Sequence, residues 1–574
     1  MRIKVSRSKN SESYFVIKDI YKNNKRTTKV VEALGNRREI LEKHPGVDPL
    51  EWAKNYAKQL KEEQKQKNAK IIAKYDPNKI ISKGKQLSFN IGYLFLQSIY
   101  HELKINKICQ EISKRYEFSF DLHTILSRLI YMRVLHPTSK KGTFESAHDL
   151  LEPHDVQPQH IYRALDVLAD ESDYIEEMVY KNSLDVVDRN TSVLYYDCTN
   201  FYFEIEEADG LRQYGMSKEN RPNPIVQMGL FMDGSGLPLA FVIHPGNQNE
   251  QPTLKPLEKR IIKDFKLSKF IVCTDAGLSS RENRLYNSMG NRAYVTTQSI
   301  KKLKRHLKEW ALDPEGWSLF GNSDGGARHQ KKIHLHDIHA NDKHTYYKER
   351  WINEDGLEQR FIVTFSPKHK RYQQAIRERQ IDRAIKKIER SDRLDKKGPN
   401  DPSRFIQSTH VTSEGEIAKK TQHTLNDKQI EKESMYDGFY GVCTNLESTV
   451  DEIIQINQQR WEIEETFRIL KSEMRSRPVY VRNDNRVKAH FLTCFLSLLV
   501  YRILEKKLDE SFTCPEIIQT LRKMNVMEYP GEGYIPTYTR TDVTDELHKV
   551  FGFRTDTEIV EQKRMKKIIK QTKK

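Results

Sequence analysis

The chain has 574 residues and a formal net charge of +17, from 97 Lys and Arg against 80 Asp and Glu. This length exceeds what one hydrophobic core supports and predicts several domains, while the charge favours a polyanionic partner, either nucleic acid or an anionic membrane surface. Six scattered cysteines without a C-x-x-C pair argue against a disulfide scaffold or a tetrahedral zinc site. No stretch reaches the roughly 18–20 apolar residues that cross a bilayer, and no signal peptide is apparent, so we expect a cytoplasmic protein.

The sequence of residues 1–80 predicts a small β unit followed by a basic helix. Two strand-like segments, 14–17 and 29–34, flank an Asn-rich basic turn at 22–26. The very polar segment 48–75 is expected to be helical, and its lysines could track phosphates. A solvated linker helix explains the same pattern.

Residues 81–185 carry helical patterns that are interrupted at His136-Pro137 and Glu152-Pro153. The segment 157–165 could open a recognition helix, in which case Arg163 is a candidate DNA contact. An ordinary connecting helix with a polar face is the alternative, and the pattern favours it. We interpret the region as a helical DNA-binding region.

Residues 186–299 predict the first part of an α/β core. The segment 193–203 is rich in aromatic and β-forming residues and contains Asp197, although Asp is depleted in strands. A hairpin over 225–243 and a helix ending near residue 263 follow. The short apolar run 270–274 then ends at Asp275, as a buried parallel strand does when it delivers a carboxylate to the edge of a sheet. A turn or N-cap role is the alternative for Asp275.

Residues 300–435 predict a β-rich insertion, with strand-like segments such as 360–365 and a basic helix over 373–390. Three tryptophans, Trp310, Trp317 and Trp351, could stack on an unpaired base, but core packing is the favoured interpretation. The insertion interrupts the core, whose second part is expected over 436–510.

A helix is expected over residues 458–471, because the segment lacks Gly and Pro. At about 100° per residue, four charged side chains fall within a narrow arc beside an apolar stripe: Arg460, Glu464, Arg468 and Lys471. An acid flanked by three cations could form a functional site, and a salt-bridge ladder is the alternative.

The remaining segments are expected to play structural or non-specific roles. The apolar segment 491–504 is interpreted as a buried helix, and Cys198 and Cys273 as buried small hydrophobic residues. In the C-terminal region, 511–574, the basic stretch 563–574 predicts a mobile tail that adds non-specific DNA affinity.

Taken together, the order Asp197, Asp275, Glu464 resembles the catalytic triad of the DDE insertion-sequence transposases, which have an RNase H-like core. Arg460, Glu464 and Lys471 keep the spacing of a bacterial branch with the signature Y-(2)-R-(3)-E-(6)-K and a β-rich insertion domain. Asn457 stands where that branch has its Tyr, which puts the contact of that Tyr with the transposon end in doubt.

The resemblance implies a multidomain α/β fold and a two-metal-ion mechanism. Asp197, Asp275 and Glu464 would hold two Mg²⁺ ions, for which Mn²⁺ could substitute, because hard divalent cations prefer oxygen ligands. Five side chains would contact DNA: Arg460, Arg468, Lys471, Asn457 and Arg163.

The implied activity is cleavage and transfer of DNA strands at the terminal inverted repeats of a mobile element, by a cut-and-paste route. The implied partners are double-stranded DNA, at transposon ends and target, and a second copy of the chain in a dimer assembled on DNA near the nucleoid. A catalytically inactive DNA-binding regulator and an RNase H-like DNA nuclease are the alternatives.

Overall fold

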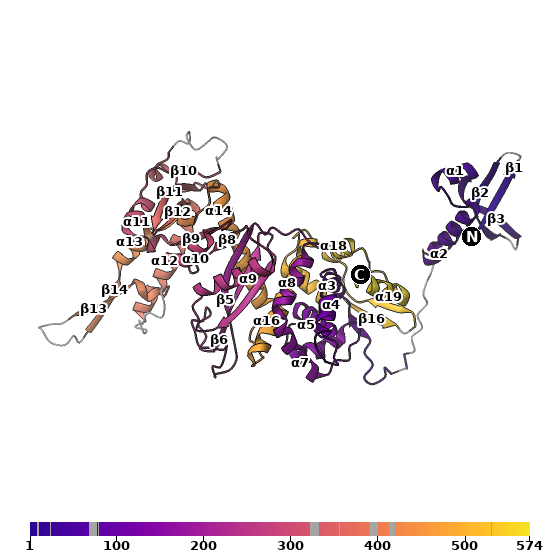
Figure 1. Ribbon diagram of the computed structural model, residues 1–574, viewed down its shortest axis with the longest axis horizontal. Coiled ribbons are helices and arrows are strands. Elements are labelled where there is room, and N and C mark those ends of the chain that lie inside the picture. The colour runs from indigo at the N-terminus through magenta and orange to yellow at the C-terminus, as the bar shows by residue number, and fades with distance from the viewer. Residues whose placement is uncertain are drawn as a thin grey trace. The chain divides into compact units, whose positions relative to one another are not determined.

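The computed structural model describes residues 1–8, 11–22, 25–67, 77–78, 80–321, 332–354, 356–390, 400–411, 420–529 and 531–574. They form two compact units, Met1–Lys85 and Gln86–Lys574 (Figure 1).

The first unit is a three-stranded antiparallel sheet in the order β1-β2-β3 with two helices. Its elements are β1 (Arg2–Ser8), β2 (Ser11–Lys22), β3 (Lys25–Asn36), α1 (Arg37–Lys43) and α2 (Pro49–Lys67). The strands predicted at 14–17 and 29–34 are confirmed, since they lie within β2 and β3. Asn36 caps α1 by accepting hydrogen bonds from two backbone N–H groups of its first turn. The described part of the helix expected over 48–75 ends at Lys67; residues 23, 24 and 68–75 lie outside the described residues.

A nine-stranded mixed sheet runs through the second unit in the order β10-β11-β12-β15-β9-β8-β5-β6-β7. The strands are β5 (Val193–Tyr202), β6 (Ile225–Asp233), β7 (Pro238–Pro245), β8 (Ile271–Thr274), β9 (Ala293–Gln298), β10 (Ser318–Leu319), β11 (Tyr346–Glu354), β12 (Leu357–Phe365) and β15 (Phe439–Thr444). The β5-β8 and β8-β9 pairs are parallel, and the other pairs are antiparallel. The predicted hairpin over 225–243 is confirmed as β6 and β7.

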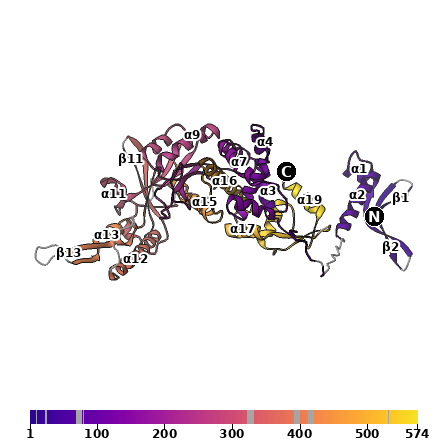
Figure 2. The ribbon, with the colours of Figure 1, turned by 90° about the horizontal axis from the view of Figure 1, so that it is seen from below.

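The segment expected to be a β-rich insertion does not form a sheet of its own. Strands β11 and β12 join the central sheet, because β12 pairs with β15 and β15 pairs with β9. Only the hairpin of β13 (Ile406–Val411) and β14 (Lys420–Leu425) is a separate two-stranded sheet, and it projects from the unit in Figures 1 and 2. The basic helix expected at 373–390 is confirmed as α12 (Pro367–Glu389).

The helices of this α/β part connect or cover the strands. They are α9 (Leu254–Asp264), α10 (Arg281–Asn287), α11 (Arg305–Leu312), α13 (Asp427–Ser434), α14 (Val450–Gln459) and α15 (Trp461–Ser472), with 3₁₀ turns at Gln251–Thr253, Ile300–Lys302, Leu335–Asp337 and Pro402–Phe405.

The helical region and the C-terminal region form one body, in which β4 pairs with β16. Its elements are β4 (Ser88–Asn90), α3 (Tyr93–Glu102), α4 (Ile105–Ser113), α5 (Leu122–Leu135), α6 (Lys140–Ser146), a 3₁₀ turn (Ala147–Asp149), α7 (Pro158–Asp170), α8 (Ser172–Ser183), α16 (Asp484–Lys507), α17 (Cys514–Lys523), β16 (Asn525–Tyr529), β17 (Gly533–Pro536), α18 (Asp542–Phe551), β18 (Val560–Glu561) and α19 (Gln562–Gln571).

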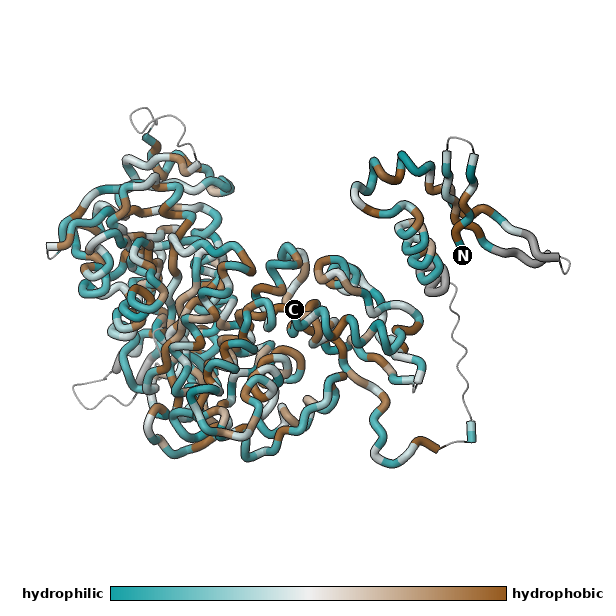
Figure 3. Tube along the Cα trace, turned by 45° about the vertical axis from the view of Figure 1, so that its right-hand side comes forward, coloured by the Kyte–Doolittle hydropathy of each residue, from teal (hydrophilic) through white to brown (hydrophobic). Residues whose placement is uncertain are grey.

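Helix α16 is the central helix of this body. In the described part of the chain it is the one helix long and apolar enough to cross a membrane, yet 94% of that apolar window is buried inside the protein. It packs against α3, α5 and α7, which confirms the buried helix predicted over 491–504. Figure 3 shows hydrophobic and hydrophilic residues interspersed along the chain, as expected where most elements bury one face and expose the other.

The C-terminal basic segment is not a mobile tail, so that prediction was wrong. Residues 562–571 form α19, which buries Met565 and Ile568 in the core. Gln97 of α3 donates a hydrogen bond to the Thr572 hydroxyl (3.1 Å), and Lys573 pairs with Glu152. The two apolar side chains recur at helical spacing among the lysines, and this amphipathic pattern outweighs the charge.

The tryptophans divide between packing and exposure. Trp317 is fully buried, packs edge-on against Phe365 and at a tilt against Phe439, and donates its indole N–H to the Asp313 carbonyl at 2.9 Å. Trp310 is partly buried in the same cluster. Core packing is therefore confirmed for these two, whereas Trp351 on β11 is 47% exposed.

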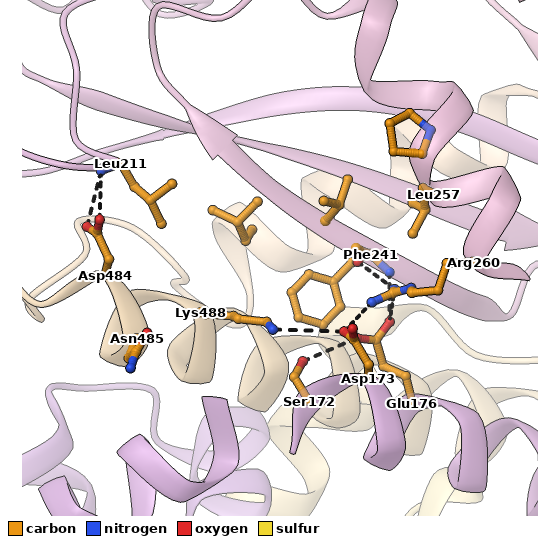
Figure 4. Close-up of a pocket in the computed structure, with 13 residues that line it drawn as sticks. Ser172, Asp173, Glu176, Leu211, Phe241, Leu257, Arg260, Asp484, Asn485 and Lys488 are labelled. Carbon is orange, nitrogen blue, oxygen red and sulfur yellow. Dashed lines mark hydrogen bonds and ion pairs between the residues drawn. The ribbon is translucent and has the colours of Figure 1, made fainter. Parts of the chain in front are cut away.

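The outer edge of β7 is protected by a buried ion pair (Figure 4). Glu176 of α8 accepts the Phe241 N–H at 3.0 Å, and Arg260 of α9 donates to the Phe241 carbonyl at 2.9 Å while pairing with Glu176 at 2.8 Å. These side chains occupy the hydrogen-bonding groups of an edge strand that would otherwise attract another strand. They line a cavity of about 480 Å³ between α8, β7, α9 and α16.

A buried carboxyl group on α9 makes stability depend on pH. Burial raises the pKa of Glu258 from 4.5 to about 8, against the opposing effects of a hydrogen bond from Asn287 and the charges of Arg292 and Lys255. Between these two pH values the unfolded chain has released the proton and the folded protein still holds it, so the contribution of this group to stability falls as pH rises.

Replacing Glu258 with Gln, a neutral isostere, should remove this penalty. We expect Glu258→Gln to be more stable than the wild type by up to a few kcal/mol at pH 8.5, with the difference disappearing towards pH 5. Urea denaturation at both pH values measures the effect, with Glu282→Gln on exposed α10 as the control. An equal difference at both pH values would contradict the assignment.

Candidate active site

Two aspartates lie side by side on neighbouring parallel strands. Tyr195 of β5 is in register with Cys273 of β8. Two residues further along, Asp197 therefore lies beside Asp275, which directly follows β8. Adjacent strands are about 4.8 Å apart, and side chains two positions apart share a face of the sheet. The two carboxylates consequently project from neighbouring points on one face.

Both carboxylates are held in place by backbone N–H groups. Asp197 Oδ1 accepts the N–H of Cys198 at 2.8 Å. Asp275 Oδ1 accepts the N–H groups of Gly277 and Leu278 at 2.9 and 3.1 Å. The turn role considered for Asp275 is thus real, and it orients the carboxylate beside Asp197.

Ionisation of the Asp197 carboxyl group is unfavourable in this environment. Burial, with a contribution from the charge of Asp275, raises its pKa to about 6 against the opposing effects of the Lys218 and Arg460 cations. Two carboxylates side by side in a buried site repel each other unless positive charge lies between them. The pair is therefore suited to bind a cation.

Two consecutive helices cover the aspartate face. The Tyr195 hydroxyl donates to the Ile456 carbonyl at 3.2 Å and to Gln459 Oε1 at 2.9 Å, which fixes the end of α14 above β5. The helix predicted over 458–471 is confirmed from Trp461 to Lys471, but it does not continue unbroken through Arg460. The segment is divided into α14 and α15, with Arg460 between them as the cap of both.

Arg460 connects Glu464 to the aspartates electrostatically. Arg460 Nη1 pairs with Glu464 Oε1 at 2.8 Å, and the charges of both Glu464 and Asp197 act on Arg460. The Glu464 side chain is 57% exposed. Because the Glu464 carboxylate is mostly exposed, water can replace Arg460 as its partner, although the Arg460 side chain itself is only 20% exposed.

Among the described residues, no three His, Cys, Asp or Glu side chains lie close enough together to hold a metal ion. The two aspartates are neighbours, whereas the Glu464 carboxylate is engaged by Arg460. A shared ion would require a rotation of the Glu464 side chain, for which its exposure leaves room.

Lys471 lies beside the same strand. Its Nζ is 5.5 Å from the centre of the Phe201 ring, four residues beyond Asp197 on the same face of β5. Burial, with a contribution from the charge of Lys218, lowers the pKa of Lys471 to about 8 against the opposing effect of Asp197. Lys471 is thus a cation of this site, one that anionic substrate would stabilise.

Asn457, which stands at the Tyr position of the signature, is buried in α14. Its side chain donates to the Tyr440 hydroxyl at 3.1 Å and accepts from Thr297 at 3.4 Å. These contacts tie α14 to β15 and β9.

Arg468 and Arg163 do not join the aspartate cluster. Arg468 pairs with its neighbour Glu465, and its other electrostatic partners are Cys514 and Glu473 rather than the aspartates. Arg163 is exposed on α7, whose opposite face packs on α16.

Sequence reasoning missed the residues that the β5-β6 loop brings to the site. Lys218 donates to the Cys198 carbonyl at 2.5 Å and pairs with Glu250 at 3.2 Å. Glu219 pairs with Lys471 at 3.6 Å. The charged run 218–221 was the available signal, but its spacing indicates no partner.

The fold and the site define an α/β protein with paired acids and surrounding cations on a central mixed sheet. Residues 191–500 match the family model described as "Transposase DDE domain", over more than half of the chain. The protein belongs to this family. No curated protein matches the sequence.

Three solved structures are similar over part of their length. The similarity to the piggyBac transposase synaptic complex with hairpin DNA covers 84% of this chain and 84% of the matched chain, with 9% identity and a TM-score of 0.35. The Mos1 transposase paired-end complex with left transposon end covers 44% and 68% (11% identity, TM-score 0.13). The Mos1 mariner paired end complex with Mn covers 45% and 70% (11% identity, TM-score 0.14).

Proposed function

We propose that the protein is a DNA transposase that binds the terminal inverted repeats of its element and catalyses metal-dependent strand cleavage and strand transfer by a cut-and-paste route. The family match and the in-register aspartates beneath the helix of Glu464 carry this proposal. Five neighbouring strands of the sheet have the order β7-β6-β5-β8-β9. The first three are antiparallel, and β8 and β9 then continue parallel to β5. This arrangement supports an RNase H-like core.

The acids of the site fit a pair of divalent cations. All three candidate ligands, Asp197, Asp275 and Glu464, offer carboxylate oxygens, which Mg²⁺ and Mn²⁺ prefer. The raised pKa of Asp197, caused by burial with a contribution from Asp275, means that negative charge on this pair is unfavourable and that a bound cation would stabilise it. Bound ions would activate the attacking hydroxyl or water and stabilise the departing oxygen.

The surrounding cations would hold the DNA. Arg460, a planar bidentate donor, and Lys471, a compact charge, both lie at the aspartate face and are suited to phosphates on either side of the scissile bond. When Arg460 takes a phosphate, it releases Glu464 towards the aspartates. Arg468 and Arg163 would contact DNA away from the reacting phosphate, whereas Asn457, also expected to contact DNA, is buried and hydrogen-bonded to Tyr440.

Strand transfer requires two transposon ends to be held together, so the active species would be a dimer assembled on double-stranded DNA, in the cytoplasm at the nucleoid. The net charge of +17 supports this partner, because neutralised phosphates release counter-ions.

The test is cleavage of a labelled DNA fragment that carries the inverted repeats flanking the gene. With Mg²⁺, the purified protein should nick at the repeat ends and leave a fragment with scrambled repeats intact. Specific binding without cleavage in Mg²⁺ or Mn²⁺ would instead indicate a DNA-binding regulator and contradict the proposed enzyme.

A further inference from the structure

The loop that joins β5 to β6 folds back over the strand that carries Asp197. Lys218 donates to the Cys198 carbonyl at 2.5 Å, and the buried Asn200 side chain donates to the Met216 carbonyl at 3.1 Å. These two contacts place the next residue, Glu219, between the strand and the end of α15.

The Glu219 carboxylate is surrounded by three cations from three segments. Lys471 of α15 lies 3.6 Å away, Arg221 of the loop lies 3.8 Å away, and Arg477, beyond α15, contacts Glu219 directly. Both guanidinium groups also lie over the ring of Tyr202, the last residue of β5, at 4.2 and 6.0 Å. The three cations therefore converge on one point at the end of the catalytic strand.

The charges at this point do not balance. Within the residues that the structure describes, Glu219 is the only acid that forms an ion pair with Lys471, Arg221 or Arg477. The Lys471 side chain is 14% exposed and those of Arg477 and Glu219 are 25% exposed, so solvent screens these three charges only partly, whereas Arg221 is 49% exposed. One carboxylate against three cations leaves an excess of positive charge that a stronger anion would neutralise.

We propose that Glu219 is a placeholder that occupies, in the DNA-free protein, a subsite for a backbone phosphate formed by Lys471, Arg477 and Arg221. The inference rests on the proposed function and adds to it two phosphate contacts, Arg221 and Arg477, and an internal competitor. A carboxylate and a phosphodiester both present two oxygens that share one negative charge, and arginine binds either in a bidentate manner. DNA therefore has to displace Glu219 before the strand reaches Asp197.

The competing explanation is that Glu219 only anchors the loop. The two explanations predict opposite effects of Glu219→Gln, which keeps the shape of the side chain and removes its charge. If Glu219 competes with DNA, the substitution tightens DNA binding. If Glu219 only anchors the loop, the substitution loosens the loop, and DNA binding becomes weaker or stays the same.

The experiment measures fluorescence anisotropy of a random-sequence duplex between 50 and 200 mM salt, since a phosphate subsite does not require a specific sequence (salt range after). Glu219→Gln should bind roughly three- to tenfold more tightly than the wild type at low salt, and the plot of log affinity against log salt should steepen by about one. The steepening arises because the cations that Glu219 no longer neutralises bind an anion from the buffer, and DNA releases this anion when it binds.

The matched control is Glu546→Gln on α18, which removes the same charge from a side chain of similar exposure that pairs with Lys549. It should change affinity less than twofold and leave the salt dependence unaltered, as a surface charge distant from the DNA would. Arg477→Met should weaken binding and flatten the salt dependence by about one, whether or not Glu219→Gln folds well.

Unchanged or weaker binding by Glu219→Gln, relative to Glu546→Gln, would overturn the inference while leaving the proposed function intact. Wild-type affinity in Arg477→Met would overturn it as well. Failure of the wild-type protein to bind any duplex would overturn both proposals.

Discussion

Carboxamide replacements at the three acids, Asp197→Asn, Asp275→Asn and Glu464→Gln, should each slow DNA strand cleavage by at least about a thousandfold while leaving duplex binding close to that of the wild type. Loss of one oxygen ligand removes several kcal/mol of charge stabilisation from a metal-assisted phosphoryl transfer, and each 1.36 kcal/mol is a factor of ten in rate. Duplex binding rests on the cations around the acids, which these variants keep.

At least two of these variants should leave the stability of the fold intact. Asp197→Asn replaces a buried carboxyl group whose charge is opposed by burial, so it should not lower stability at neutral pH. Glu464→Gln alters an exposed helix position and should be neutral. Single-turnover nicking of a repeat-bearing fragment measures the rate, and thermal unfolding verifies the fold.

The control is Glu465→Gln, which lies next to Glu464 on α15 but pairs with Arg468 away from the aspartates. It should nick at nearly the wild-type rate. If Asp197→Asn, Asp275→Asn or Glu464→Gln retained more than about a tenth of the wild-type rate, that side chain would not be a metal ligand.

The largest effect on stability is expected at the turn between β6 and β7. Arg189 and Asp233 form an ion pair of 2.6 Å, and both side chains are fully buried. Asp233 Oδ1 also accepts the N–H groups of Ser235 and Leu237, while Arg189 donates to the carbonyls of Leu237 and Pro238. The pair therefore satisfies the backbone of the turn as well as its own charges.

Asp233→Ala should lower the free energy of unfolding by about 3–5 kcal/mol, because it leaves the buried guanidinium without a counter-charge. Urea denaturation at pH 7.5 gives the value. Asp185→Ala removes an acid that is 71% exposed and pairs with Lys104, itself 42% exposed, and it should change stability by less than about 0.5 kcal/mol. Similar small losses in both variants would contradict the importance of the buried pair.

Local sequence patterns located the elements that carry the acids. Aromatic and β-forming residues predicted β5, and an apolar run ending in Asp and Gly predicted β8. The register that places Asp197 beside Asp275 lies outside such patterns, because strand pairing depends on residues far apart in the sequence. The break at Arg460 was missed for a related reason: no Gly or Pro marks it, and contacts of Tyr195 with α14 fix where the first helix ends.

Charge was the least reliable guide to position. The basic stretch 563–574 suggested a mobile tail, but Met565 and Ile568 dock it as α19. Arg468 shares a helix arc with Lys471 in projection, yet a neighbouring acid, Glu465, holds it elsewhere. Conversely, Glu219 carried no motif at all, since its importance comes from the three cations that folding brings around it.

The most direct test of the proposed mechanism is a crystal structure of the protein with DNA and Mn²⁺, examined by anomalous scattering. We expect two manganese peaks contacted by carboxylate oxygens of Asp197, Asp275 and Glu464, with Glu464 released from Arg460. Manganese bound elsewhere, or Glu464 still paired with Arg460 while DNA occupies the aspartate face, would contradict the assignment of these three acids as one metal site.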